Sequence, residues 1–424
     1  YAAIRENFTS VETLDLSEME NAEIPVVAFE YIENLSSVVV PDNVTAIGEN
    51  AFAGCSNLES VTLGAVDAIG ANAFNGCENL TSITINSNGG NAAAFRRAPR
   101  LNGIDAASFA GINPNCIIFV ADENISINDV KNVVYSGSGT RHALTDIMLS
   151  AEYPFHTPGS FNLGDRSISL SVPVKCRRST VSDNWSGIVL PFAPAHVTVD
   201  GVDYSIAATG ANTLSMMTFA DSDAEELSHA DAVEPNVPYV VRVNDMGDAP
   251  VTALFSATGA VAESADEVPT AFDVPRTPES AELARGGKLF TICGNYLPRE
   301  AAEGEYVIDA TGELFELVDP EAETIPSVAP FGVVLRANEA GAPASLKIGT
   351  DDSSAIVAVA AVEADGLTLS REGGIMVITS DRARKLAIFD LSGRCVASLW
   401  LEAGRNTVEL PSGIYLVAGL KIRM

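Results

Sequence analysis

Four histidines and six cysteines are the residues of this sequence whose types most often carry catalysis or hold a metal. The histidines are His142, His156, His196 and His229, and the cysteines lie at positions 55, 77, 116, 176, 293 and 395. No CxxC pair and no cysteine–histidine cluster occurs among them, so their spacing predicts neither a zinc nor an iron–sulfur site. The motifs GxSxG, HExxH, GxxxxGKS and GxGxxG are absent as well. We therefore expect a chain that is not an enzyme and has no catalytic residue, cofactor or metal.

Carboxylates and aromatic side chains leave one alternative open in the middle of the chain. With 56 Asp and Glu residues, paired carboxylates could be drawn almost anywhere, so their spacing alone does not predict a glycosidase. Trp185, Tyr239 and Tyr296 could stack on a sugar, although burial in a core is the commoner role of such residues. A carbohydrate-binding or hydrolytic site within residues 140–350 is the alternative function that remains.

The charge balance excludes two classes of partner. The chain has 25 Lys and Arg against 56 Asp and Glu, a formal net charge of −31. Nucleic acids and anionic lipid surfaces are bound by fields of Lys and Arg, which this composition lacks.

No apolar run is long enough for a transmembrane helix. Residues 1–15 contain no signal-peptide core, so we expect a mature or trimmed product of a secreted precursor.

A sequence repeat organises the first third of the chain. Residues 35–57 and 58–79 align, with Phe52 recurring as Phe74 at an offset of 22 residues, and weaker copies bring the total to about five within residues 1–135. In each copy, the pattern L-x-x-L-x-L predicts a short strand with one buried face. The Gly-x-Asn-Ala-Phe segment that follows predicts a turn and a short helical return. Because one coil cannot bury its own ends, neighbouring coils must stack, and the repeat predicts a parallel solenoid.

The repeated cysteines and phenylalanines are expected to pack inside this stack. Equivalent cysteines of adjacent coils, Cys55 and Cys77, would lie about 5 Å apart, which a disulfide would allow. Their side chains point the same way, however, so we expect free buried thiols. The phenylalanines expected in the core are Phe52, Phe74, Phe95 and Phe109.

The repeated phrase G-x-N-A-F-x-G-C-x-N-L resembles the leucine-rich repeats of BspA-like bacterial surface proteins. The resemblance covers about a third of the chain. It implies a secreted or cell-surface protein of Bacteroidetes, exposed on the outer membrane exterior, that mediates adhesion or protein–protein interaction. The partner would be a protein, of a host or of its matrix, or a glycan.

Outward positions of the repeat strands form the candidate interaction face. They are mostly small and hydroxylated, and none is a Tyr, Trp or Arg, the types that usually anchor an interface. A solvated sheet without a partner, and hence a purely structural spacer, is therefore an equally open interpretation. The candidate residues are Thr13, Asp15, Ser37, Val39, Ser60, Thr62, Ser82 and Thr84.

The remaining chain is predicted to be β-rich, which gives a mixed, mainly β fold of three domains. After the leucine-rich-repeat solenoid of residues 1–135, residues 140–350 show short strand-like runs between Pro, Gly and Asp, typical of one or two antiparallel β domains. Residues 355–424 predict a small β-sandwich. Within it, Ile388–Arg394 and Leu410–Val417 resemble the C-terminal sorting domain of type IX secretion, which implies a delivery address, although similar modules also serve a structural role.

Overall fold

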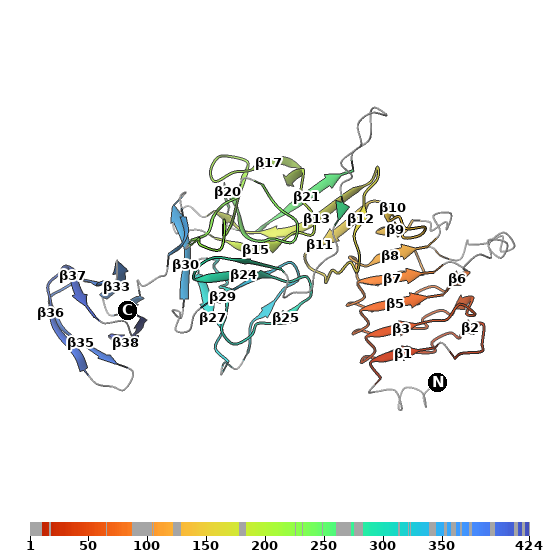
Figure 1. The fold of residues 1–424 in the computed structure, drawn as a ribbon, viewed down its shortest axis with the longest axis horizontal. Coiled ribbons are helices and arrows are strands. Elements are labelled where there is room, and N and C mark those ends of the chain that lie inside the picture. Colours follow the sequence, from red (N-terminus) through yellow and green to blue (C-terminus); the bar gives the residue numbers. More distant parts are fainter. Residues whose placement is uncertain are drawn as a thin grey trace.

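Within the part of the chain that it describes, the computed structural model contains strands joined by turns and loops and no helix (Figure 1). That part is residues 11–423 except 17, 65, 87–103, 105, 122–128, 178–183, 225, 231, 248, 260–272, 275–282, 313, 321, 323, 339–344, 352–353, 358–361, 365–366, 373–374, 391–394, 411–413 and 418–419. The prediction of a mainly β chain is confirmed.

A long sheet runs through the repeats and continues beyond them. Its strands, in spatial order, are β1 (Thr13–Asp15), β3 (Ser37–Val39), β5 (Ser60–Leu63), β7 (Ser82–Ile85), β8 (Ile117–Val120), β9 (Val133–Tyr135), β10 (His142–Ala143), β12 (Phe161–Asn162) and β22 (Asp273–Val274). The strands from β1 to β9 pair in parallel, and Val38, Val61 and Ile83 lie side by side at equivalent repeat positions. Figure 1 shows these strands stacked one above another.

A second, shorter ladder completes the first three coils. It consists of the parallel strands β2 (Glu23–Ile24), β4 (Ala46–Ile47) and β6 (Ala68–Ile69). In the turn segments that follow β2, β4 and β6, Phe52 stacks on Phe29 at 5.2 Å and on Phe74 at 5.6 Å between ring centroids. Phe52, Phe74 and Phe109 are buried in one apolar core, as predicted, whereas Phe95 lies outside the described residues.

Each strand of the second ladder is followed in the chain by a succession of turns rather than by the expected short helix. Backbone N–H groups in them donate to the next coil: Phe29 to the Ala51 carbonyl at 2.7 Å and Phe52 to that of Ala73 at 2.8 Å. These bonds between coils replace the bonds within a helix. Gly48 is needed for close approach, since a Cβ there would lie 2.5 Å from the Val26 nitrogen.

The cysteines of the repeats are free and buried, as predicted. The Cys55 thiol donates to the Phe29 carbonyl at 3.2 Å, and the Cys77 thiol to the Phe52 carbonyl at 3.3 Å. Burial raises the pKa of Cys55 to about 11, although the Ile32 backbone lowers it slightly. Burial also raises the pKa values of Cys77 and Cys116. These thiols therefore stay protonated at neutral pH and pack as small apolar groups.

The long sheet is continuous across the predicted first boundary at residues 135–140. Strands β9 and β10 pair antiparallel, so the chain reverses at residues 136–141 within the sheet. Three buried asparagines reinforce this junction. Asn113 donates to the Pro154 carbonyl at 2.8 Å, Asn115 to those of Ser150 and Tyr153 at 2.7 Å, and Asn132 accepts from the Met148 N–H at 2.7 Å.

Two large, mostly antiparallel sheets form the middle of the chain. One contains β11 (Ile147–Ser150), β13 (Ser167–Val174), β21 (Val251–Thr258), β16 (His196–Val199), β17 (Val202–Ile206), β18 (Thr213–Thr218), β20 (Pro238–Met246) and β14 (Cys176–Arg177), with β15 (Ser186–Val189) beside β20 and β19 (Ser228–His229) beside β18. The other contains β23 (Ala284–Gly286), β24 (Phe290–Gly294), β29 (Val333–Ala337), β26 (Glu305–Ile308), β27 (Leu314–Leu317), β30 (Ser345–Asp351) and β31 (Ser354–Val357). β25 (Arg299–Glu300) and β28 (Ser327–Val328) pair separately, and both large sheets contribute to one shared core.

The last part of the chain is a pair of four-stranded antiparallel sheets. The first contains β32 (Val362–Ala364), β33 (Leu367–Glu372), β34 (Ile375–Ser380) and β37 (Gly404–Glu409), and the second β36 (Cys395–Leu401), β35 (Arg384–Asp390), β38 (Ile414–Val417) and β39 (Leu420–Arg423). A small apolar core takes residues from both sheets, among them Ile378 and Ile388.

Candidate interaction face

The outward side chains of the repeat strands form two columns across the long sheet. In one column Thr13, Ser37, Ser60 and Ser82 are successive partners in the parallel pairing. The neighbouring column contains Asp15, Val39, Thr62 and Thr84 in the same succession. The regular repeat therefore brings all eight candidate residues onto one side of the sheet, because alternate residues of a strand point to the same face.

Exposure along these columns is graded from open to closed. Thr13 and Asp15 are exposed, Val39 is 41% exposed, and Thr62 is half-buried. Ser82 is only 7% exposed, so its side chain contributes little to an accessible face. The usable candidate face lies over β1, β3 and β5, with Thr84 at its margin.

The closed end of the face is explained by the residues that follow in the same columns. Ser82 pairs with Ile117, and Thr84 pairs with Phe119, which in turn pairs with Val134. Ile117, Phe119 and Val134 belong to the apolar core of the middle region, whereas the intervening Ile118 belongs to the core of the coils. Strand β8 is thus buried on both sides, and the middle region covers the face where the repeats end.

Carboxylates border the open part of the face. Glu12 and Glu59 precede β1 and β5, while Glu18 and Asp42 follow β1 and β3, and all four are exposed. Residues 11–86 contain twelve Asp and Glu and no Lys or Arg. This local excess was not predicted, although a count of charges along the repeats would have revealed it. The face can therefore attract a cationic surface.

The chemistry available on the face is limited to hydroxyl, methyl and carboxylate groups. The Ser37 hydroxyl donates to that of Thr13 at 3.4 Å, a contact within the ladder itself. Throughout the described ranges, no group of three or more His, Cys, Asp or Glu side chains is arranged to hold a metal ion. The sequence of the repeat region also has a basic cluster, Arg96, Arg97 and Arg100, which lies outside the described residues. Hydroxyl, methyl and carboxylate groups can make hydrogen bonds, apolar contacts and ion pairs with a partner.

The aromatic residues considered for sugar stacking are buried in the middle region. Trp185 and Tyr239 are 1% exposed and Tyr296 is 3% exposed, so none of them presents a ring to a ligand. The Trp185 ring instead carries the Arg242 guanidinium at 4.6 Å from its centroid. Their role in the core agrees with the commoner interpretation of these residues.

The structure brings one serine–histidine pair together that the sequence did not reveal. The Ser215 hydroxyl lies 3.1 Å from Nδ1 of His229, because β18 and β19 pair antiparallel. A serine nucleophile must be reachable by its substrate. Ser215 is 0% exposed, so this pair is part of the packing between strands.

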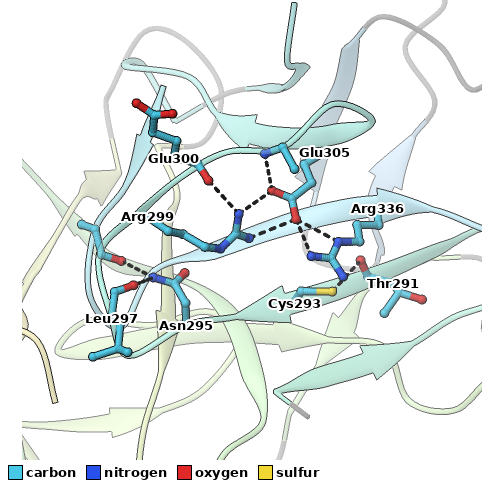
Figure 2. A network of polar contacts seen from close by, with 10 residues as sticks. Thr291, Cys293, Asn295, Leu297, Arg299, Glu300, Glu305 and Arg336 are labelled. Atoms are coloured by element: carbon cyan, nitrogen blue, oxygen red, sulfur yellow. Dashed lines mark hydrogen bonds and ion pairs between the residues drawn. The ribbon is translucent and has the colours of Figure 1, made fainter. Parts of the chain in front are cut away.

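A buried carboxylate also has a structural explanation. Glu305 is 1% exposed, and its two oxygens accept hydrogen bonds from Arg299 at 2.7 and 3.0 Å and from Arg336 at 2.8 and 2.6 Å (Figure 2). The Ala302 N–H adds a fifth bond at 2.8 Å. Burial opposes ionisation of Glu305, but these donors outweigh it and lower its pKa. With its oxygens occupied, Glu305 stays ionised and joins β25, β26 and β29.

Comparison with known proteins identifies the repeats and nothing beyond them. The described residues contain no helix long and apolar enough to cross a membrane. No curated protein and no solved structure shows significant similarity to the chain. The family model of the BspA type leucine-rich repeat region matches residues 6–129 in six copies, one more than the sequence pattern suggested. Residues 6–129, which include the strands of the open face, are therefore a BspA-type leucine-rich repeat region.

Proposed function

We propose that this chain is a non-catalytic interaction protein whose parallel coils form a solenoid and bind another protein through the open face over β1, β3 and β5. The observation that carries the proposal is the graded exposure of the two columns of side chains. Thr13, Val39 and Thr62 are accessible, whereas the same columns are covered by the middle region at their other end. Within the face, β3 and β5 are paired in parallel on both sides, and β1 is paired with β3. A partner would therefore meet an ordered surface and lose little entropy in ordering it.

The partner that fits this face is a protein with exposed Lys or Arg side chains. The face is bordered by Glu12, Glu18, Asp42 and Glu59, and residues 11–86 contain no Lys or Arg. Electrostatic complementarity of this kind raises association rates and selects the partner. Binding should accordingly weaken as the salt concentration rises.

A secreted or cell-surface location is part of the proposal. Leucine-rich repeats of the BspA type are typical of such proteins, and the proposal extends this to adhesion in a member of the Bacteroidetes. We propose that residues 355–424, with their own core, form a sandwich that acts as a delivery module of the sorting-domain kind. Detection of the epitope-tagged protein outside the native cells, lost on deletion of residues 355–424, would support this role. Retention of export after the deletion would contradict it.

The experiment is surface plasmon resonance of the full chain against immobilised host matrix proteins, with a glycan array in parallel. A Val39→Arg variant places bulk and a positive charge on the open face. Its matched control is Ala71→Arg, at an exposed position of the turn segment after β6. We expect at least one matrix protein to bind, and binding to fall about tenfold or more for Val39→Arg alone.

Three outcomes would contradict this proposed function. Equal binding by Val39→Arg and Ala71→Arg would show that the face is not the contact. Binding of glycans but not proteins would favour the carbohydrate-binding alternative. Absence of binding to every protein and glycan tested would favour a structural spacer.

A further inference from the structure

The turn segment of residues 25–31, in the first described coil, departs from its repeat. Tyr31 has a left-handed backbone with φ of 61°, a conformation that Gly54 and Gly76 adopt at the equivalent positions of the next two coils with φ of 74° and 75°. Glycine is the residue suited to this conformation, and a bulky side chain there is an outlier. The first coil therefore retains a tyrosine where the repeat favours glycine.

The Tyr31 ring is held in place by the glycine of the following coil. The atoms nearest to a Cβ added at Gly54 are Cδ1 and Cε1 of Tyr31, so the ring lies over Gly54 in the space that a side chain would fill. The Tyr31 N–H also donates to the Ala53 carbonyl at 2.7 Å. Backbone and ring are thus both fixed against the next coil, which lowers the entropy cost of using this side chain in binding.

The same ring is open to solvent on its other side. Tyr31 is 59% exposed, and Val26, in the same turn segment, is 50% exposed. Tyrosines that are rigid and accessible are common anchors of protein interfaces. The turn segment 25–31 therefore provides an aromatic anchor, which the open face over β1, β3 and β5 lacks.

The charges around this ring indicate which group it would contact. Glu30 precedes Tyr31 and is half-buried, Glu33 follows it and is exposed, and residues 11–86 contain no Lys or Arg. The negative face of an aromatic ring attracts cations, most often the guanidinium of Arg, and nearby carboxylates reinforce the attraction. A neutral sugar could stack on the ring but would gain nothing from these charges.

We propose that Tyr31 is the anchor of a second interaction surface, made by the turn segment 25–31, which binds an arginine or lysine side chain of a partner protein. This surface goes beyond the proposed function, because it uses the turn segment after β2 and not the ladder strands. The two surfaces can be tested separately.

The test measures, by isothermal titration calorimetry at about 0.1 M salt, how tightly variants of the full chain bind a peptide in which five arginines alternate with glycine. The matched neutral probe has citrulline in place of each arginine. We expect Tyr31→Gly, which suits the backbone at this position, to weaken binding of the arginine peptide about three- to fivefold. Binding of the citrulline peptide should be weak for every variant.

A glycine pair provides a control that keeps Tyr31 itself. Gly54→Ala would push the tyrosine ring aside, whereas Gly76→Ala has the same left-handed backbone and meets only Gly54 backbone atoms at 3.5 Å. Both substitutions carry a similar backbone cost, but only Gly54→Ala should weaken binding of the arginine peptide. Circular dichroism checks that each variant is folded.

Several results would overturn the assignment of Tyr31. The first is equal affinity of the wild-type chain for the arginine and citrulline peptides. The second is unchanged affinity of Tyr31→Gly for the arginine peptide, and the third is an equal loss of affinity in Gly54→Ala and Gly76→Ala. In a Val39→Arg background, which keeps the Tyr31 ring, Tyr31→Gly should still weaken binding of the arginine peptide about three- to fivefold. Failure of the ladder proposal would therefore leave the Tyr31 result interpretable.

Discussion

Replacement of Glu305 by glutamine tests whether the buried carboxylate of the middle region is structural. Glu305 is 1% exposed, and its ion-pair partners Arg299 and Arg336 have side chains that are 26% and 50% exposed. An amide at position 305 offers one acceptor oxygen and turns an NH₂ group toward guanidinium donors. Removing one partner of a buried ion pair costs about 3–5 kcal/mol of stability. Because both arginines are partly exposed, we expect the loss of stability in Glu305→Gln to lie at the lower end, about 3 kcal/mol.

Urea unfolding followed by tryptophan fluorescence measures this loss. The chain has two tryptophans, Trp185 at 1% exposure in the middle region and Trp400 at 67%. In a Trp400→Phe background the signal reports on the region that contains Glu305. We expect the free energy of unfolding of that region to fall by about 3 kcal/mol in Glu305→Gln. A loss below about 1 kcal/mol would refute the reasoning that the network stabilises the fold.

The pH dependence of the same comparison provides an independent check. Because the pKa of Glu305 is lowered in the folded chain, its ionised form contributes stability above its unfolded pKa, and this contribution is lost as pH falls through the lower folded value. The difference in unfolding free energy between wild type and Glu305→Gln should be constant from pH 7 to about 5 and shrink below about pH 4. A difference that grows on acidification would contradict the assigned direction.

Three further predictions concern the repeats. Val27 has φ of 52°, where the next coils have asparagine, so Val27→Asn should raise the free energy of urea unfolding by up to about 1 kcal/mol, and a decrease would speak against backbone strain. Gly70→Ala should lower it by about 1–3 kcal/mol, because a Cβ at Gly70 would lie 2.5 Å from the Glu49 nitrogen, and full tolerance would refute this close approach. Cys55, with its pKa raised to about 11, should resist iodoacetamide at pH 8 until the chain is unfolded; rapid modification of the native chain, located by mass spectrometry, would contradict its burial.

Much of the repeat region could be predicted because its physics is local and periodic. Phe52 and Phe74 recur at one offset, and a side chain that recurs in every coil must pack against its own copy. The close approach at Gly48 escaped prediction, since glycine also permits turns, and only the spacing of the coils distinguishes the two roles.

The end of the open face depends on contacts that a sequence period does not contain. Ser82 occupies the same position in its coil as Ser60, but its neighbour in the sheet is Ile117. The uninterrupted apolar run of β8 is typical of a strand buried on both sides and could have indicated this closure. Glu305 and Arg336 are 31 residues apart, and their pairing arises only when the antiparallel strands β26 and β29 come together.

The most direct test of the stacked, open face is the alkylation rate of single cysteines introduced into the native full chain at positions 38, 39 and 82. Val39 is 41% exposed, whereas Val38 is 1% and Ser82 is 7% exposed. We predict rapid alkylation at position 39 and protection at both other positions, because neighbouring residues of a strand point to opposite faces and β8 closes the column beside Ser82. Rapid alkylation at position 38 with protection at position 39, or equal rates at all three, would contradict the account.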